Sequence, residues 1–313
     1  MPKAVAVILV NYNTPDYTIN CVNSLKQYCN TSLFDVIVLD NGSADDSLNI
    51  LRTALPSDRI IANGQNLGFA EGNNVGLRIS IDEGYTYSLV INTDTLTNED
   101  VVSGLYSYLQ ENITVAAVQP AIYWMHDRAN IWNGPCYFNK FTGKVYSKTQ
   151  VETAIKTVDW ATGCCVMYRN SALAKSGLFN KRFFLYYEDT ELSLRLGENG
   201  FGIYYLPQYK IYHEAGVSGK TKTKQKEGYL WPVIHYYTTR NRIWILRLYG
   251  SAVFTPIYLL YHGGYILGLL GYLTMRGRFA KVRQVIKGIK EGLFTSKAII
   301  MAGANDKADD LAQ

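Results

Sequence analysis

The feature that most constrains the fold of this 313-residue chain is an apolar run that stops abruptly at a polar cluster. Residues 87–91 form a predicted buried strand, and Asn92, Thr93 and Asp94 follow it directly. In an open α/β sheet, ligands bind outside the carboxyl ends of the strands, so Asp94 is well placed to meet a substrate or a metal ion. Taken alone, the cluster is more typical of a turn that caps the next helix, but the rest of the chain repeats the pattern.

The same plan occurs twice earlier in the chain. Residues 4–10 and 36–39 are apolar runs rich in β-branched residues, and each breaks into a polar loop before a helical segment. Short buried strands that alternate with helices are typical of a parallel sheet with βα crossovers. The second loop contains Asp40 and Asn41. These side chains suit hydrogen bonds to a ribose or a base, with an Asx turn as an equally good alternative.

Three glycines, Gly68, Gly72 and Gly76, then recur at a helical spacing. They do not form the G-x-G-x-x-G turn of dinucleotide-binding proteins, which argues against a dehydrogenase. Small residues at this spacing let the start of a helix approach the sheet or a ligand closely. Its free amide N–H groups could then face phosphate.

A second acidic cluster, Glu188 and Asp189, follows the aromatic stretch 183–187 and opens a predicted helix. Acidic residues at a helix start commonly do no more than complement the helix dipole. Here the preceding aromatic residues are expected to form an apolar wall, which would raise a carboxyl pKa toward the range of a proton acceptor.

Together these motifs resemble, in order and spacing, an inverting family 2 glycosyltransferase of the GT-A fold, most closely its rhamnosyltransferase-like branch. The resemblance covers most of residues 4–242 and rests on residues 10–13, 38–43, 66–76, 91–94 and 183–192. It implies that the first loops hold the nucleoside and that a D-x-D-type motif holds Mn²⁺ or Mg²⁺. Asn92 stands where many members have the first aspartate, so only Asp94 is carried over as a metal ligand. Sites for these cations commonly take one or two carboxylates plus phosphate and water.

The resemblance also assigns roles residue by residue. It makes Asp189 the general base, with Glu188 beside it, and makes His213 the residue that completes the metal site. The residues implied to bind nucleotide are Asn11, Tyr12, Asn13, Asp40, Asn41, Gly68, Asn73, Asn92 and Asp94. Those implied at the acceptor site or in a lid are Trp160, Thr162, Gly163, Lys220, Lys222 and Arg240. The alternating lysines that include Lys220 and Lys222 suit a solvated loop and a basic lid over the diphosphate equally well.

Charge divides the chain unevenly. Residues 1–209 carry 15 Lys/Arg and 20 Asp/Glu, whereas residues 210–300 carry 15 and 3. The basic part contains residues 248–275, a run of 28 residues without Asp, Glu, Lys or Arg. Its length allows a transmembrane helix. Its glycines, its proline and its two basic flanks favour an interfacial helical pair on an anionic leaflet instead.

The expected architecture is an α/β protein with a GT-A, Rossmann-like, mostly parallel sheet flanked by helices and a C-terminal helical membrane-associating appendage. Residues 1–240 are the expected catalytic domain, with a nucleotide half at about 1–118 and an acceptor half at about 119–240. Residues 241–313 are the basic and apolar appendage with a polar tail. Five cysteines without a C-x-x-C pair favour a reducing compartment, and the N-terminus turns polar too early for a secretory signal. We therefore expect a cytoplasmic protein at the inner face of the plasma membrane.

By the resemblance, the protein transfers a sugar from a dTDP- or UDP-sugar to a saccharide or polyprenyl-linked acceptor with inversion, in cell-surface polysaccharide synthesis. L-Rhamnose from dTDP-rhamnose is the expected donor sugar. No nucleic acid partner is expected, and oligomerisation stays open. One alternative is a nucleotidyltransferase, but this chain lacks the glycine-rich basic loop that such an enzyme would carry. The other is a non-catalytic nucleotide-sugar-binding membrane adaptor. The presence of Asp94, Asp189 and His213 argues against the adaptor.

Overall fold

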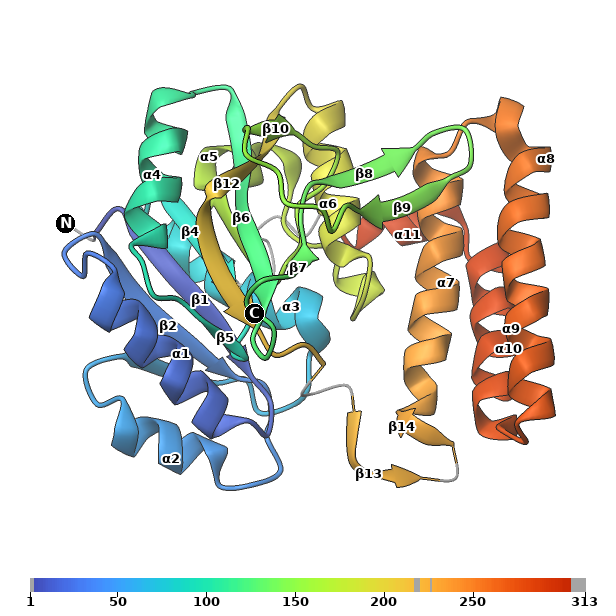
Figure 1. Ribbon diagram of the computed structural model, residues 1–313, viewed down its shortest axis with the longest axis horizontal. Coiled ribbons are helices and arrows are strands. Elements are labelled where there is room, and N and C mark those ends of the chain that lie inside the picture. The colour runs from blue at the N-terminus through green and yellow to red at the C-terminus, as the bar shows by residue number, and fades with distance from the viewer. Residues whose placement is uncertain (1–2, 217–219, 226, 305–313) are drawn as a thin grey trace.

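A central sheet with helices on both faces lies beside a bundle of C-terminal helices in the computed structural model, which describes residues 3–216, 220–225 and 227–304 (Figure 1). The strand order is β10-β12-β6-β11-β4-β1-β2-β3, with β5 paired to β12 and β7 paired to β6. The sheet strands are β1 (Val5–Asn11), β2 (Phe34–Asp40), β3 (Arg59–Ala62), β4 (Tyr87–Ile91), β5 (Thr95–Leu96), β6 (Val115–Trp124), β7 (Ile131–Asn133), β10 (Lys156–Thr157), β11 (Cys165–Arg169) and β12 (Gly202–His213).

The first four strands of the chain confirm the predicted βα pattern. β1 pairs in parallel with β2 and β4, and β2 pairs in parallel with β3. The register sets Asn11 beside Asp40, so the polar ends of β1 and β2 meet at one edge of the sheet. β11 departs from the parallel order, because it runs antiparallel to both β4 and β6, and the short strands β5, β7 and β10 are also antiparallel to their partners. The sheet is therefore mixed beyond β4.

Alternating side chains of the strands build two core layers, as the period of two along a strand requires. Val5, Val7 and Leu9 of β1 face one layer, and Ala6 and Ile8 face the other. The first layer is covered by α1 (Pro15–Tyr28), α2 (Ser47–Ala54) and α4 (Val101–Glu111). The second layer is covered by α3 (Gly68–Asp82), α5 (Asn170–Ser176) and α6 (Glu188–Glu198).

The segment after β7 contains a hairpin of two strands, β8 (Cys136–Asn139) and β9 (Lys144–Ser147). Its tip lies against the C-terminal helices (Figure 1). Gly143 in the tip has a φ of +69°, and a Cβ atom there would lie 2.1 Å from the Leu246 side chain. A side chain at this position would strain the backbone and displace Leu246, so the glycine permits the close contact between hairpin and helix. The five cysteines are all free and buried, as expected of small core residues.

The C-terminal segment forms helices that lie side by side. These elements are α7 (Pro232–Tyr249), a 3₁₀ turn (Ala252–Phe254), α8 (Thr255–Tyr258), a π-helical turn (Leu259–Gly263), α9 (Gly264–Met275), α10 (Phe279–Phe294) and α11 (Lys297–Ala302). α7 and α10 approach closely at Gly288, where a Cβ atom would lie 2.7 Å from the Tyr236 carbonyl oxygen. Tyr249 of α7 donates a hydrogen bond to Glu191 of α6 at 2.9 Å, which ties the bundle to the sheet domain.

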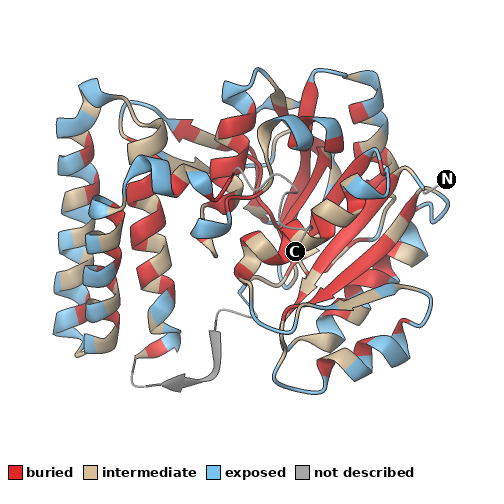
Figure 2. Ribbon diagram, turned by 180° about the vertical axis from the view of Figure 1, so that it is seen from behind, coloured by how far each residue is buried: buried red, intermediate tan, exposed pale blue. Residues whose placement is uncertain are grey.

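The outer surface of this bundle is largely exposed (Figure 2). Within the described residues, one helical stretch, Ala252–Met275, is long and apolar enough to cross a membrane. Only 17% of its most apolar window is buried inside the protein. Leu260 is 80% exposed and Met275 is 89% exposed. An apolar helix with this exposure is not a core helix of the domain. Its apolar surface is therefore available for contact with another apolar surface.

Candidate active site

The polar ends of β1 and β2 form a connected network. Asp40 accepts hydrogen bonds from Asn11 Nδ2 at 2.9 Å and from the Ser43 hydroxyl at 2.7 Å, and it also accepts from the Ser43 N–H at 3.1 Å. Asp40 and Asn11 are both buried. Asp40 thus accepts a backbone N–H three positions along the chain, one position further than in the Asx turn that the sequence offered as an alternative. These hydrogen bonds fix the carboxylate at the sheet edge where a nucleoside is expected to lie.

Neighbouring residues extend this edge. Asn41 binds the loop before α3, because its amide donates to the Gly68 carbonyl oxygen at 3.0 Å and accepts from the Leu67 N–H at 3.1 Å. Tyr12 is half-buried and Asn13 is exposed. Asn13 has a φ of +56° and accepts a hydrogen bond from the Ala44 N–H at 2.8 Å. The loops after β1 and β2 thus hold one another in place.

The start of α3 differs from the expectation that its amides face phosphate. The N–H groups of Phe69 and Ala70 both donate to the Phe184 carbonyl oxygen, at 2.7 and 3.2 Å. Gly68, with a φ of +75°, lies so close to Phe184 that a Cβ atom would be 2.5 Å from that oxygen. Asn73 is buried, and its amide donates to the Phe69 carbonyl oxygen at 2.9 Å. This helix start therefore holds the 183–187 loop, and those two amides are not available to an anion.

Asp94 and His213 meet although they are far apart in sequence. The short strand β5 pairs with β12 in the register His213 to Thr95, which brings His213 Nε2 to 3.1 Å from Asp94 Oδ1. Both residues are buried, and the Trp132 ring centre lies 4.3 Å from that of His213. The Nδ1 atom of His213 has no hydrogen-bond partner among the described residues. Asn92, half-buried, donates its backbone N–H to the Cys164 carbonyl oxygen at 2.8 Å.

One carboxylate oxygen and one imidazole nitrogen suit a divalent cation whose other ligands are diphosphate oxygens and water. Within the described part of the chain, no cluster of three or more His, Cys, Asp or Glu residues can hold a metal ion by itself. The donor set therefore fits a cation that is shared between the protein and a bound nucleotide, as the sequence predicts for Asp94 and His213.

Asp189 and Glu188 occupy different environments at the start of α6. Asp189 accepts hydrogen bonds from the N–H groups of Gly163, at 3.0 Å, and Thr190, at 2.6 Å. Burial raises the pKa of Asp189, and these donors oppose the rise because they stabilise the carboxylate. Burial and the neighbouring Asp189 hold the pKa of Glu188 well above its ordinary value, and Glu188 Oε2 has no partner among the described residues. Of the two, Asp189 is the easier group to ionise, because two N–H groups stabilise its carboxylate and Glu188 Oε2 has no such donor among the described residues.

The start of β11 connects the two acidic centres. Gly163 donates to Asp189, and the next residue, Cys164, accepts from Asn92 at the Asp94 motif. Gln119 positions Thr162, because its side-chain oxygen accepts a hydrogen bond from the Thr162 N–H at 2.8 Å. Trp160 is buried and donates its indole N–H to the Tyr137 carbonyl oxygen at 3.2 Å. The predicted base, the metal ligands and the acceptor segment therefore lie around one strand junction.

The loop before Asp189 has an unusual backbone that the sequence analysis did not anticipate. Phe184, Tyr186 and Tyr187 all have positive φ values, between 64° and 68°. Such residues cost about 1–3 kcal/mol each and persist only where the surrounding structure enforces them. Asn241 stabilises this loop conformation, because its side-chain amide donates hydrogen bonds to the carbonyl oxygens of Phe183, Leu185 and Tyr186 at 3.0, 3.0 and 2.7 Å.

Arg240 supports the same loop. It donates to the carbonyl oxygens of Arg182 and Phe183 at 2.7 and 3.0 Å, and its guanidinium lies 4.1 Å from the Trp244 ring centre. The structure thus places Arg240 in contact with the loop that carries the base. It also places Asn241 there, a residue to which the sequence analysis gave no role. The available signal was the adjacency of Asn241 to Arg240.

Lys220 and Lys222 lie on β13 (Lys220–Gln225), which pairs with β14 (Gly228–Leu230). Their role as a lid stays a prediction.

The fold and this constellation define a glycosyltransferase of the GT-A class. The chain belongs to glycosyl transferase family 2, which matches residues 6–177. Two solved structures share the fold. GalNAc-T7, solved with UDP, GalNAc and Mn²⁺, superposes with a TM-score of 0.63 at 11% identity over 97% of this chain and 58% of that one. The mannosyltransferase PcManGT from Pyrobaculum calidifontis, solved with GDP-Man and Mn²⁺, gives 0.55 at 13% identity over 94% and 88%.

Sequence relatives place the chain in the rhamnosyltransferase-like part of the family. It is 24% identical to the dTDP-rhamnosyl transferase RfbF of Shigella flexneri, over 79% of this chain and 81% of RfbF. It is 23% identical to the N-acetylglucosaminyl-diphospho-decaprenol L-rhamnosyltransferase of Mycobacterium tuberculosis, over 70% and 79%. The hexosyltransferase Agl10 of low-salt glycan biosynthesis in Haloferax volcanii is 27% identical over 63% of each chain, so the match spans less than two thirds of Agl10.

Proposed function

We propose that this glycosyltransferase moves L-rhamnose from dTDP-L-rhamnose to a saccharide acceptor, with inversion, in cell-surface polysaccharide synthesis. The observation that carries the proposal is the convergence of Asp189 and the Asp94–His213 pair on the Gly163–Cys164 junction. The names of the RfbF and Mycobacterium relatives support the donor. The name of the Mycobacterium relative also supports an acceptor carried on a polyprenyl diphosphate.

The reaction is a single displacement. Asp189 accepts the proton of the acceptor hydroxyl, and that oxygen forms a bond to the anomeric carbon on the face opposite the diphosphate. The bond between the anomeric carbon and the diphosphate oxygen breaks in the same step, so the configuration inverts. The N–H groups of Gly163 and Thr190 hold the carboxylate in one orientation throughout. The raised pKa of Glu188 limits the negative charge beside the base.

Asp94 and His213 would hold a divalent cation, Mn²⁺ or Mg²⁺, together with the nucleotide. A cation bound there supplies charge neutralisation for the departing diphosphate. The sheet edge formed by Asn11, Asp40 and Asn41 would bind the nucleoside, with Tyr12 and Asn13 beside it. Gly68 supports that edge from α3, because its carbonyl oxygen accepts a hydrogen bond from Asn41, and Asn73 stabilises the same helix start through Phe69.

We propose that residues 1–240 act as the catalytic domain and that residues 241–313 hold it against the cytoplasmic face of the plasma membrane. The exposed apolar stretch Ala252–Met275 supports this arrangement, together with the 15 Lys/Arg against 3 Asp/Glu of residues 210–300. An apolar helix flanked by basic residues is the pattern of a helix that lies in the interface of an anionic leaflet.

The purified protein, supplied with Mn²⁺, tests the donor directly. It should transfer labelled sugar from dTDP-L-rhamnose to a lipid-linked N-acetylglucosamine diphosphate, and UDP- and GDP-sugars should be poorer donors. Transfer of nucleotide label instead of sugar label would identify a nucleotidyltransferase. Binding of dTDP-rhamnose without any transfer or hydrolysis would identify a non-catalytic adaptor.

A further inference from the structure

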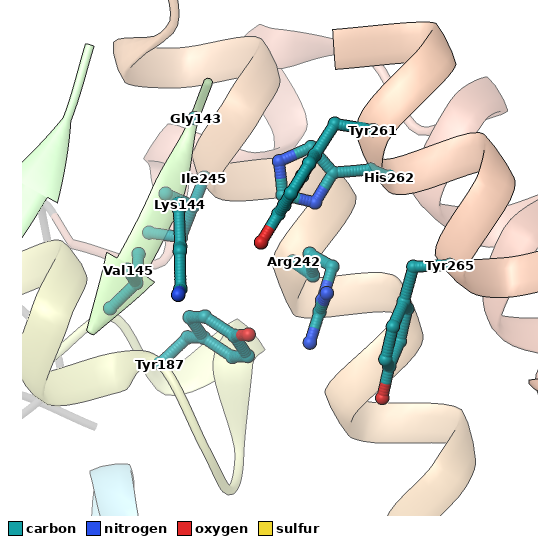
Figure 3. A pocket seen from close by; sticks show the side chains of 9 residues that line it. All are labelled: Gly143, Lys144, Val145, Tyr187, Arg242, Ile245, Tyr261, His262 and Tyr265. Atoms are coloured by element: carbon teal, nitrogen blue, oxygen red, sulfur yellow. The ribbon is translucent and has the colours of Figure 1, made fainter. Parts of the chain in front are cut away.

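A cavity lies where the catalytic domain meets the C-terminal helices (Figure 3). Its volume is about 210 Å³. Pockets that enclose whole drug-sized ligands measure roughly 300–1,000 Å³, so this cavity suits the joined part of a sugar ring and a diphosphate, with the rest of a larger ligand outside it. It is formed by the β8–β9 hairpin, the loop before α6, α7 and the apolar C-terminal helix. The side chains that matter are those of Lys144, Tyr187, Arg242, Tyr261, His262 and Tyr265.

His262 presents an unused hydrogen-bond acceptor at this cavity. It lies in the π-helical turn Leu259–Gly263, a kind of turn that is frequent at functional sites. The residue is only 5% exposed. Its Nε2 atom lies 2.9 Å from the Thr142 carbonyl oxygen, so Nε2 carries the hydrogen and donates it. Nδ1 of the neutral ring is then a lone-pair acceptor, and it has no partner among the described residues. A buried acceptor of this kind calls for a hydroxyl donor from a ligand.

The charged side chains of the cavity are both cationic. Figure 3 shows Arg242 between Tyr187 and Tyr265, with Lys144 entering from the hairpin. The Arg242 guanidinium lies 4.2 Å from the Tyr265 ring centre. None of the described residues that line the cavity is acidic, and neither Arg242 nor Lys144 forms an ion pair within the described part of the chain. Cations without protein counter-charges favour an anionic ligand, and a guanidinium matches the oxygens of phosphate.

The cavity lies between the loop that carries the base and the exposed apolar helix. Tyr187 lines the cavity and precedes the base Asp189 by two positions, so their Cα atoms are at most about 7 Å apart. Tyr261 and Tyr265 lie on the exposed apolar helix, and both are themselves partly exposed. The cavity therefore lies beside the loop that carries the base on one side and beside the proposed membrane surface on the other.

We propose that this cavity binds the diphosphate and first sugar of a lipid-linked glycosyl acceptor. Arg242 and Lys144 contact the diphosphate, His262 Nδ1 accepts a hydrogen bond from a hydroxyl of the sugar, and the lipid leaves along the apolar face of Ala252–Met275. The proposal rests on the proposed function, since it names the acceptor subsite of that reaction. It makes Arg242 a residue for the lipid-linked acceptor and gives it no part in donor binding.

The test uses the full chain with its nucleotide site filled by dTDP and Mn²⁺, so that added phosphates cannot bind there. Calorimetry measures the affinity of three probes, which are farnesyl-diphospho-N-acetylglucosamine, inorganic pyrophosphate and neutral octyl N-acetylglucosaminide. Arg242→Met and Lys144→Met should each weaken the first probe by about 10-fold or more, since each removes a charge-assisted contact. Both variants should bind the neutral glycoside as the wild type does.

Arg283→Met is the matched control, because it removes one charge from an exposed position of the same basic segment. Its affinity for the farnesyl-linked probe should be unchanged. If all three variants lost the same affinity for the farnesyl-linked probe, the effect would be a general attraction by the basic segment, and the subsite would be overturned. Inorganic pyrophosphate binding as tightly as the lipid-linked probe would overturn the lipid-linked assignment. If Arg242→Met fails to bind dTDP, and has therefore lost its fold, the exposed Lys144→Met variant decides alone.

Steady-state kinetics separates this proposal from the proposed function. A raised acceptor KM in both variants, with an unchanged KM for dTDP-rhamnose, supports the two together. Normal transfer with an unchanged acceptor KM removes the subsite and leaves the function intact. Absence of transfer, combined with probe binding that depends on Arg242, retains the subsite and removes the proposed reaction.

Discussion

His213 Nε2 lies 3.1 Å from Asp94 Oδ1, although 119 positions separate the two residues in the chain. The contact depends on β5, a strand of only two residues that pairs with the end of β12. A pair held this firmly, with one carboxylate and one imidazole, is half of a cation site that a nucleotide can complete.

Asp94→Asn should therefore weaken the response of the enzyme to Mn²⁺. An amide keeps the shape of the side chain but is a weaker ligand than a carboxylate, so the Mn²⁺ concentration for half-maximal transfer should rise by about 10-fold or more. Asp82→Asn, an exposed carboxylate on α3, is the control and should titrate like the wild type. Full wild-type activity in EDTA would contradict this role.

Glu188→Gln should stabilise the folded protein above the ordinary carboxyl pKa. Because burial raises the pKa of Glu188, the folded state holds a proton that the unfolded state releases, and stability falls as pH rises from the unfolded pKa toward the folded pKa. Glutamine binds no proton, so its advantage should grow as pH rises above the ordinary carboxyl pKa of about 4. Thermal unfolding of both proteins across this range measures it. A difference in Tm that is constant with pH would show that Glu188 is not neutral in the fold.

Asn241→Asp should impair catalysis through the 183–187 loop. The change removes the amide donor that faces three carbonyl oxygens and puts a carboxylate there, which costs about 1–3 kcal/mol or more. We expect a lower Tm and a kcat reduced by about 10-fold or more, with a smaller change in the affinity for dTDP, since this loop contacts the nucleotide edge only at the start of α3. Asn20→Asp, at an exposed position of α1, makes the same chemical change without these effects. Normal kcat in a folded Asn241→Asp protein would remove the positioning role.

Binding to anionic vesicles should depend on salt. Apolar burial of Ala252–Met275 should supply most of the affinity, and Lys/Arg residues near the leaflet should add roughly 1 kcal/mol each. Co-sedimentation should weaken as ionic strength rises, because exposed charges are screened. Retention through high-salt and carbonate washes would instead identify a transmembrane helix, and no binding at all would make this surface a contact between protein chains.

The polar strand ends were predictable because each follows a buried run in one continuous stretch of sequence. Residues 87–91 were predicted as a strand, and β4 is Tyr87–Ile91. Asp40 and Asp94 follow the same local logic. The acidic helix start at Glu188 was also local, since α6 begins at that residue. These features need only the residues next to them.

The rest depends on contacts between distant segments. Nothing near Cys165 in the sequence signals that β11 runs antiparallel to its neighbours, because that direction is set by β4 and β6 on either side. The amides at the start of α3 suited phosphate by local rules, but the strained loop at Phe184 occupies two of them. The support from Asn241 comes from a helix that begins at Pro232, more than forty residues beyond the loop.

The central claim is that Asp189 acts as the base of a sugar transfer, and the pH dependence of transfer tests it most directly. With dTDP-L-rhamnose, lipid-linked acceptor and Mn²⁺, kcat/KM should fall as pH decreases through the pKa of Asp189. Burial raises that pKa, so the fall should be centred above the ordinary carboxyl value of about 4. Asp189→Asn should lose about 10²–10⁴-fold in kcat, lose the acidic limb and keep its affinity for dTDP. Near-normal turnover by Asp189→Asn, with the acidic limb still present, would contradict the account.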